Sequence, residues 1–452
     1  MSDTLTSTGN LFRRGAAGYE AARKATVWRV NTPDRHPDIV VRATSVADVI
    51  AAVKLARAEN LKVGVRSGGH SWTSPHLRDA SLLIDLDALR DIDIDPISQT
   101  AWVQPAAKGR ALNDALMPYG LMAPTGHHDT VACGGFLMCG GFGWNWRQWG
   151  NGCRNVLEIE CVNALGELIR ASETENPDYY WAARGGGAGF FGVVTRFKVR
   201  AYPRPSHMRA NGYVFPGEHS EAVLSWLYSI LPSLPVYCEL VASWSSFDPA
   251  TGDWAPTKMM VGGLTFANSE EEADIVAKIF DTCPVEDQAL IRRRNEATTL
   301  EARYEAATAA DPEGYRFAAD NIYTDKGAGD IVPLIRPMIE SLPTPRSHIF
   351  WCYNGPRPDF SGMALSAWGE TYFASYPIWN DRADDDRMQK WVVDAMRFLD
   401  PIANGEAQMN DENMEAHPQA YISQDVAQKL ERLRAQYDPE QRFLSFLEGG
   451  QR

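Results

Sequence analysis

The stretch KVGVRSGGHS, Lys62 to Ser71, decides the fold class of this chain. A short strand-like run ends there in two glycines, a histidine and a serine. The run DIVVRAT (38–44) comes before it as another strand, and Ser45 with Asp48 makes a capping box for a helix between the two. The sequence therefore predicts a β-helix-β unit with a glycine turn at the carboxyl end of a strand, where α/β proteins commonly bind ligands.

Two more glycine-rich segments follow. GHHDTVACGGFLMCGGFGWNWRQWG (126–150) is the densest, and NPDYYWAARGGGAGFFGVVTRFKV (176–199) contains GAGFFG, which matches the GxGxxG pattern of nicotinamide-binding turns. Such a turn needs a strand before it and a helix after it. Here the strand-like VVTRFKV follows instead. We therefore expect a glycine loop that packs its backbone closely against another group, and not a Rossmann site.

The loop from Arg66 to Ser71 carries chemistry of its own. Its glycines can present successive backbone N–H groups to a diphosphate. His70 lies at its tip and could be a metal ligand, a base or a nucleophile. No second histidine or acid lies nearby at ligand spacing, so we predict no metal site. A histidine with only a structural role stays open as the alternative.

The composition argues against several classes of protein. The 452 residues include 44 Lys and Arg against 58 Asp and Glu, a net charge of −14, and no basic run of the kind that binds nucleic acid. No apolar stretch is long enough to cross a membrane, and the N-terminal segment lacks the apolar core of a signal peptide, so we expect a cytoplasmic protein. Seven scattered cysteines without zinc spacing indicate thiols.

The chain changes character after Pro203 and Pro205. From about Met208 onward the strand-like runs are aromatic, as in LVASWSSF (240–247) and TYFASYPIW (371–379). Helical segments lie between them. This pattern indicates an α+β domain with an aromatic-lined sheet in the middle of the chain.

Taken together, RSGGHS, GGFLMCGGFG and NPDYYWAARGGGAGFFGVVTRFKV, in that order and spacing, resemble the vanillyl-alcohol-oxidase/PCMH superfamily in its berberine-bridge-enzyme-like branch. The resemblance covers residues 37–205 and resumes in the tail, QAYISQDVAQKLERLRAQYDPEQRF (419–443). It implies an α+β fold with a PCMH-type FAD-binding domain of two α/β subdomains at 1–204. A substrate domain with an antiparallel sheet covered by helices would occupy 205–405, and a C-terminal segment, 406–452, would return to the FAD domain.

The resemblance also implies how FAD is held. The loop from Arg66 to Ser71 matches the diphosphate loop, and His70 matches the histidine that binds FAD covalently, a reaction for which a neutral imidazole is a competent nucleophile. The remaining cofactor-binding residues that it implies are Ser67, Gly68, Gly69, Gly134, Gly135, Gly140, Gly141, Gly143, Gly192, Val193, Val194 and Tyr421.

One departure from the family concerns the second covalent link. Members with two links have a cysteine in a GxCxxVG motif, whereas this chain reads GHHDTVA with His128 at that position. Cys133 comes five residues later. We therefore expect a single link through His70, as in 6-hydroxynicotine-oxidase-like members. His128 could contact the flavin edge or the substrate, and His127 is expected to face solvent.

Val131 bears on the electron acceptor. In this branch the position three after the cysteine site acts as a gate over the flavin, where valine leaves room for dioxygen and a larger residue obstructs it. Counting from His128, that position is Val131. The resemblance therefore favours an oxidase that uses dioxygen over a dehydrogenase that uses another acceptor. A flavin-binding protein without activity is the third interpretation.

The substrate and the catalytic base are less defined. Glu370 lies beside an aromatic strand, where burial would raise its pKa, although it could also cap a turn and face water. Tyr421 and His128 are the other catalytic candidates. Four aromatic residues of the middle domain favour a small aromatic or apolar alcohol, amine or phenol, although an oligosaccharide also stacks on such rings: Trp244, Trp351, Trp368 and Tyr372. The oligomeric state stays open.

Overall fold

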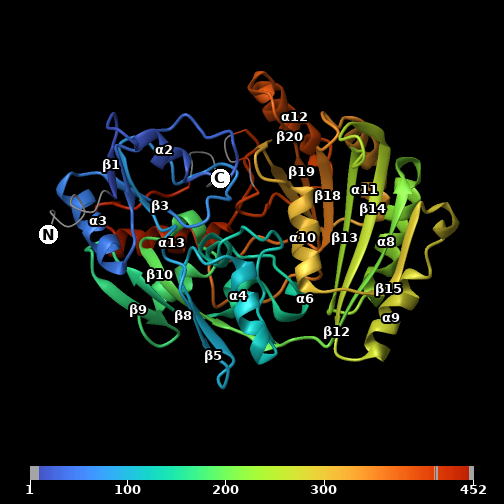
Figure 1. The fold of residues 1–452 in the computed structure, drawn as a ribbon, viewed down its shortest axis with the longest axis horizontal. Coiled ribbons are helices and arrows are strands. Elements are labelled where there is room, and N and C mark those ends of the chain that lie inside the picture. Colours follow the sequence, from blue (N-terminus) through green and yellow to red (C-terminus); the bar gives the residue numbers. More distant parts are fainter. Residues whose placement is uncertain (1–9, 412, 414–415, 447–452) are drawn as a thin grey trace.

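The computed structural model describes residues 10–411, 413 and 416–446, and has two lobes (Figure 1). The first lobe, blue to green in Figure 1, contains two of the larger sheets, and the second, light green to orange, contains the largest sheet. Helix α13 (Gln424–Tyr437), near the end of the chain, lies in the first lobe, where Leu430 and Leu433 join its core. The combination of helices and sheets confirms the predicted α+β class.

The first sheet contains the predicted β-helix-β unit. Helix α3 (Val46–Ala58) joins β2 to β3, and both strands pair in parallel with β4. The capping box is present, because the Ser45 hydroxyl accepts from the Asp48 N–H and the Asp48 carboxylate accepts from the Ser45 N–H. In order across the sheet the strands are β1 (Leu11–Arg13), β2 (Ile39–Arg42), β4 (Ser81–Asp85) and β3 (Lys62–Arg66).

The second sheet is antiparallel and carries the loop that matches GxGxxG. Helix α7 (Pro177–Ala183) comes before this loop and strand β10 comes after it, which is the reverse of a nicotinamide-binding turn. The prediction against a Rossmann site is thus confirmed. In order across the sheet the strands are β5 (Ile92–Asp95), β6 (Thr100–Val103), β10 (Val193–Arg200), β8 (Val156–Val162) and β9 (Leu168–Ser172).

The third sheet forms the second lobe, and every strand pair in it is antiparallel. Its order is β15 (Ile291–Ala297), β12 (His207–Pro216), β14 (Trp254–Ala267), β13 (Cys238–Phe247), β18 (His348–Tyr353), β19 (Thr371–Tyr376) and β17 (Asp320–Thr324). One face packs on α8 (Ser220–Ile230), α9 (Glu270–Phe280), α11 (Ala328–Glu340) and α12 (Asp385–Arg397). The predicted helix-covered antiparallel sheet is confirmed.

The two faces of this sheet differ because side chains alternate along each strand. On β13, Leu240, Ala242 and Trp244 belong to the core under the helices, whereas Val241, Ser243 and Ser245 face a cavity between the lobes. Helix α10 (Leu300–Ala310) lies on the cavity side and stands between the lobes in Figure 1.

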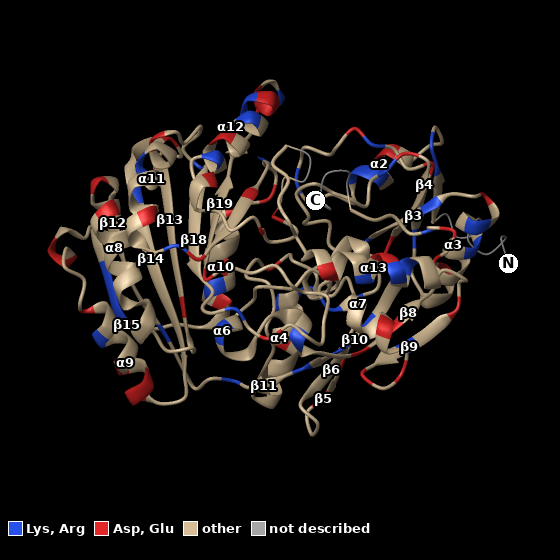
Figure 2. Ribbon diagram, turned by 180° about the vertical axis from the view of Figure 1, so that it is seen from behind, with Lys and Arg blue, Asp and Glu red and all other residues tan. Residues whose placement is uncertain are grey.

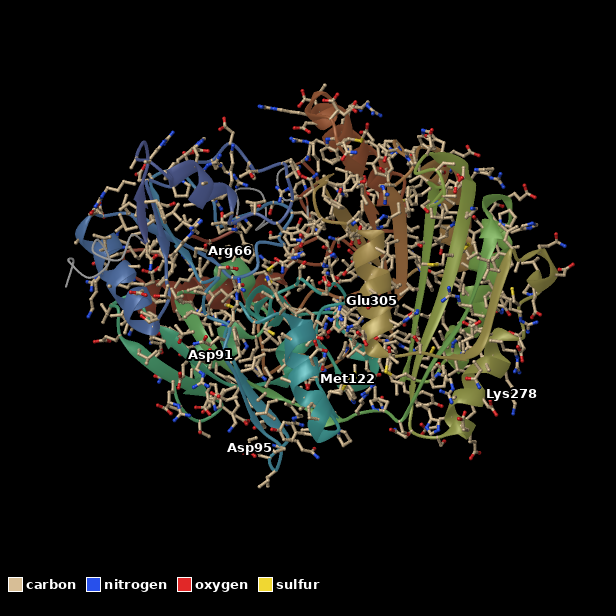
Figure 3. All side chains as sticks on the ribbon, viewed as in Figure 1. Arg66, Asp91, Asp95, Met122, Lys278 and Glu305 are labelled. Carbon is tan, nitrogen blue, oxygen red and sulfur yellow. The ribbon has the colours of Figure 1, made fainter. Side chains whose placement is uncertain are left out.

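Helix α10 is tied to the first lobe by a buried hydrogen-bond network. The Tyr304 hydroxyl lies 2.6 Å from the Thr125 hydroxyl, and the Asn113 side-chain amide donates to both oxygens. Buried polar groups that are fully paired in this way fix the relative position of two elements. Figure 3 shows Glu305 on this helix and Arg66 in the first lobe.

The remaining elements are short or connect the sheets. They are α2 (Tyr19–Lys24), α4 (Gly109–Leu116), α5 (Cys133–Met138), α6 (Trp146–Trp149), and the strand pairs β7 (Leu121–Met122) with β11 (Tyr202–Pro203) and β16 (Arg316–Phe317) with β20 (Ile378–Trp379). Among the described residues, no helix is long and apolar enough to span a bilayer.

Candidate active site

A cavity of about 1180 Å³ lies between the two lobes. Its lining comes from the loop after β3, the segment around α5 and α6, the loop before β10, the free face of the large sheet, one face of α10 and tail residues 408–411. Common ligand sites measure roughly 300–1,000 Å³, so this cavity has room for a large ligand.

Arg66 shapes the loop at the end of β3. Its guanidinium pairs with Asp85 at 2.9 Å and Asp87 at 3.0 Å, and donates to the Gly68 carbonyl at 3.1 Å. The charge of Arg66 is thus compensated by carboxylates of the protein itself. Arg66 lines the cavity, but its side chain binds other parts of the protein and so fixes the shape of the loop.

The backbone of this loop offers free donors. Within the described part of the chain, the N–H groups of Ser67, Gly68, Gly69 and His70 donate to no acceptor. Unpaired N–H groups on one turn form a concave site for an anion. These donors, beside a cavity of this size, fit the diphosphate of a dinucleotide.

Two glycines let the loop approach α5 closely. A Cβ on Gly68 would lie 2.8 Å from Cβ of Ala132, and one on Gly134 would lie 2.7 Å from Oγ of Ser67. No larger residue fits at either position without movement of the backbone. The contact brings the loop after β3 and the first turn of α5 together at one wall of the cavity.

His70 is held as a neutral imidazole. Burial lowers its pKa well below the usual value, and the neighbouring His128 and the cations Lys108 and Arg66 lower it further. Trp28 stacks on its ring with centroids 4.6 Å apart. Nε2 of His70 lies 2.8 Å from the Thr130 hydroxyl.

The hydrogen bonds of His128 assign the proton on His70. Nε2 of His128 lies 3.1 Å from the Asp311 backbone carbonyl, which only accepts, so that nitrogen carries the proton. Its Nδ1 then accepts from the Thr130 N–H and hydroxyl, at 3.3 and 2.9 Å. The Thr130 oxygen is left to accept from Nε2–H of His70. The lone pair of His70 is therefore on Nδ1.

Asp411 is the centre of a polar cluster in the cavity. Its carboxylate accepts from the Trp72 indole at 2.6 Å, the Gln408 amide at 2.9 Å, and the hydroxyls of Tyr372 and Tyr376 at 3.1 and 3.2 Å. Burial raises the pKa of Asp411 above its usual value, although these donors oppose the shift. Burial and the Asp411 charge raise the pKa of both tyrosines well above 10, so both phenols stay protonated.

A second carboxylate, Glu239, lies in another part of the cavity lining. It is 4% exposed and accepts from the Asn145 backbone N–H, and His127 lies 3.6 Å away. Burial raises its pKa. His127 was expected to face solvent but lines the cavity, because its ring packs edge-on against Trp144.

Two proposed catalytic residues are not in the cavity. The Glu370 side chain is exposed, because the residue forms the turn before β19 and its backbone carbonyl accepts from Asn354 and Gly355. This position is the alternative expected for Glu370, a residue in a turn that faces water. Tyr421 is 2% exposed and packs in the core of the first lobe, away from the lining.

Some of the other expected cofactor-binding residues line the cavity and some do not. Those that line the cavity are Arg66, Ser67, Gly68, Gly69, His70, Ser71, His128, Val131, Gly134, Gly135, Gly141, Gly192 and Val194. Gly140, Gly143 and Val193 lie outside the lining, where Gly143 packs against Thr125 and Val193 belongs to a neighbouring core. No group of three metal-ligating side chains occurs among the described residues.

The aromatic residues that line the cavity differ from the expected set. Trp244 and Trp351 are fully buried under the helices, and Trp368 packs in a separate cluster. Only Tyr372 of the four lines the cavity. The aromatic lining instead includes Trp28, Trp72, Phe350 and Tyr376.

Comparison with known proteins agrees with this geometry. The family described as "FAD binding domain" matches residues 37–172. The FAD-linked oxidoreductase ptmO of Penicillium ochrochloron is 30% identical over 433 residues, covering 95% of this chain and 94% of that protein. The structure of 6-hydroxy-D-nicotine oxidase from Arthrobacter nicotinovorans superposes with a TM-score of 0.83 at 20% identity over 96% of each chain. A berberine bridge enzyme variant gives 0.80 at 16% identity over 99% of this chain and 98% of its own.

Proposed function

This chain belongs to the FAD-linked oxidoreductases of the vanillyl-alcohol-oxidase/PCMH superfamily, berberine-bridge-enzyme-like branch, and we propose that it is an oxidase of a small organic alcohol, amine or phenol. One observation carries the proposal: Asp411 and its two tyrosines share a cavity with His70 and the free N–H groups of its loop. A proton acceptor and a cofactor site thus border the same space.

The loop after β3 would hold the cofactor. The N–H groups of Ser67 to His70 would bind the FAD diphosphate, and His70, as a neutral nucleophile, would carry the covalent link. When bound, FAD supplies the hydride acceptor and passes the electrons to dioxygen. Cys133 does not suit a second link, because it lies outside the lining and burial raises the pKa of its thiol to about 12.

Asp411 would take the substrate proton through a tyrosine. Tyr372 and Tyr376 donate to Asp411, so their oxygens keep lone pairs that can accept from a substrate hydroxyl or amine. As the substrate proton moves onto a tyrosine oxygen, that tyrosine's own proton passes to the carboxylate. The substrate is then deprotonated and Asp411 protonated, which raises the tendency of the adjacent carbon to release a hydride.

The cavity wall favours an apolar, partly aromatic substrate. Trp72 and Tyr376 lie with ring centroids 6.1 Å apart beside Asp411, and Phe350 extends the same surface. Rings of this kind bind flat apolar groups. An oligosaccharide is the second candidate, since sugars also stack on such rings.

A panel of small alcohols, amines, phenols and oligosaccharides added without oxygen tests the function. A true substrate should bleach the flavin absorbance, and subsequent addition of air should restore it with release of hydrogen peroxide. Bleaching that only an artificial acceptor reverses would identify a dehydrogenase instead. A failure of every compound to bleach the flavin would favour a binding protein without activity.

Val131 should control the reaction with dioxygen. It lines the cavity, and its Cγ1 lies 2.8 Å from where a Cβ on Gly126 would be, so the space around it is already limited. We expect Val131→Leu to slow the reoxidation of the reduced flavin several-fold and leave its reduction by substrate unchanged. Rapid mixing of substrate-reduced protein with oxygenated buffer measures both rates.

Val30→Leu, the same substitution at a half-exposed site, is the control and should reoxidise at the wild-type rate. Equal reoxidation rates for the Val131→Leu variant and wild type would show that Val131 only packs against its neighbours and does not control access of dioxygen. Wild-type reoxidation over many minutes, with fast transfer to an artificial acceptor, would replace the oxidase by the dehydrogenase.

A further inference from the structure

Four cationic side chains line the part of the cavity between α10 and the large sheet: Lys258, Arg293, Arg303 and Arg346. They come from β14, β15, α10 and the segment before β18. Figure 2 shows the basic residues of β15 as a blue stretch along the edge of the sheet. In a chain with a net charge of −14, so much positive charge beside one cavity needs a cause.

Arg303 is the most poorly compensated of the four. In the parts of the chain that the structure describes, its guanidinium has no hydrogen-bond or ion-pair partner, and its Nε is fully buried. Burial lowers the pKa of Arg303 and the charge of Arg293 lowers it further, while the charge of Glu296 opposes the shift. Nε of Arg303 has therefore lost water without gaining a partner, although the residue as a whole is only partly buried.

Lys258 and Arg346 also form no ion pair among the described residues, although the charge of Asp248 lies near Lys258. Arg346 lies over the rings of Phe247 and Tyr315, at 4.0 and 5.2 Å from their centroids. These contacts orient the guanidinium and leave its N–H groups unused. Arg293 has one weak contact, 4.0 Å from Glu296.

The carboxylates in the lining do not compensate these cations. Asp411 has four donors of its own, Glu239 pairs with Asn145 and His127, and Asp311 lies 3.8 Å from His348. None of them has an ion pair with Arg303 or Arg346 in the described structure. The charge of Glu296, whose side chain is half exposed, acts on Arg303 from outside the lining. A negative charge inside the cavity would come from a ligand.

The face of α10 shows where such a charge would lie. Arg303, Ala307 and Ala310 follow one another at helical spacing and line the cavity, with only methyl groups beyond the arginine. Asp311, whose carbonyl binds His128, comes eight residues after Arg303. At 1.5 Å per residue this separation is about 12 Å along the helix. A ligand that lies along this face would reach from the His70 and His128 wall to Arg303.

We propose that the substrate carries an anionic group, a carboxylate or a phosphate, that Arg303 and Arg293 bind, about 12 Å along α10 from Asp311. Lys258 and Arg346 would attract it to the cavity. This inference rests on the proposed function, since it assigns the far end of the molecule that is oxidised near Asp411. It names the substrate class as an elongated, apolar acid.

Binding of a matched pair of probes to the flavin-loaded protein tests the proposal. Phenylhexanoate and its neutral amide have the same size and differ in the charge of one end. We expect the acid to bind about tenfold or more tightly than the amide, as judged by calorimetry and by the shift of the flavin absorbance. Added salt should weaken the binding of the acid and leave the binding of the amide unchanged.

Arg303→Gln should remove this preference while the amide binds as before, and Arg303→Lys should keep part of it. Lys278→Gln, an exposed cation on α9, is the control and should change nothing. Thermal melting of each variant shows that it is folded. Equal binding of acid and amide to wild type, no binding of the acid at millimolar concentration, or an unchanged ratio in Arg303→Gln would overturn the proposal.

These readouts do not depend on turnover. A selective acid site in a protein whose flavin no compound bleaches would leave the anion site standing and contradict the oxidase. The reverse result, an active oxidase that binds both probes equally, would contradict only the anion site.

Discussion

Replacing His70 by alanine is expected to change a flavin that stays attached during denaturation into one that is released. In wild type, acid precipitation should leave a yellow pellet, and the band on a denaturing gel should fluoresce. In His70→Ala the colour should move entirely to the supernatant. The reason is chemical, because alanine has no nucleophile, whereas His70 is an imidazole that burial and nearby cations keep neutral.

The folded His70→Ala protein should still bind FAD without the link, since Ser67, Gly68 and Gly69 keep their free N–H groups. His127→Ala is the matched control. His127 also lines the cavity, but Thr130 forms its hydrogen bonds with His70 and His128, so loss of His127 should leave the flavin attached.

Peptide mapping by mass spectrometry gives the decisive reading. Wild type should yield one flavin-bearing peptide, with the adduct on His70. Flavin released from wild type by acid would contradict the covalent link. A second adduct on Cys133 would contradict the single attachment and would require its buried thiol, with a pKa of about 12, to have become exposed.

The loop at His70 was predictable because its signal is local. The capping box at Ser45 and the strand–glycine order of KVGVRSGGHS lie within a few tens of residues, and each element forms as these neighbours dictate. The rejection of GAGFFG as a nicotinamide turn needed only the strand that follows it. Patterns of this kind survive tertiary packing.

The Asp411 cluster was not predictable in the same way. Its partners Trp72, Tyr376 and Tyr372 lie 339, 35 and 39 residues away in sequence, and Asp411 belongs to a tail segment without periodicity. The sequence favours Glu370 instead, because it adjoins an aromatic strand. It precedes the first residue of β19, and the turn there directs it to the surface.

The sequence of β13 distinguishes the two faces of the sheet. On β13 the alternation of Ser243 and Ser245 with Ala242 and Trp244 separates a polar face from an apolar one. An apolar face of a sheet packs under helices, so Trp244 was assignable to the core from its neighbours. Tyr372 and Tyr376 lie on the other face of β19, opposite Phe373.

Asp411→Asn is expected to slow reduction of the flavin by substrate about 10²- to 10³-fold, the usual contribution of a general base. Asparagine has the same shape and keeps an oxygen for the Trp72 donor, but it cannot take a proton from Tyr372 or Tyr376. Substrate affinity should therefore change little. Anaerobic stopped-flow mixing with a substrate from the panel separates the two quantities.

The pH profile distinguishes loss of a base from a change of shape. The base must be ionised to accept a proton. The wild-type rate of flavin reduction should therefore be low at pH values below the pKa of Asp411 and rise as the pH passes through that pKa. Burial raises that pKa above 3.8, which places the acid limb at higher pH than for an ordinary aspartate. The asparagine variant should lack this limb.

Two further variants identify which carboxylate acts. Glu370→Gln should keep the wild-type rate, because that side chain is exposed and outside the cavity. Glu239→Gln tests the other buried acid, whose pKa burial also raises. Glu239 interacts with Asn145 and His127 but has no phenol that could relay a proton, whereas two phenols connect Asp411 to the cavity. If Glu239→Gln removes the acid limb and Asp411→Asn keeps it, the base is Glu239 and the relay through the tyrosines is wrong.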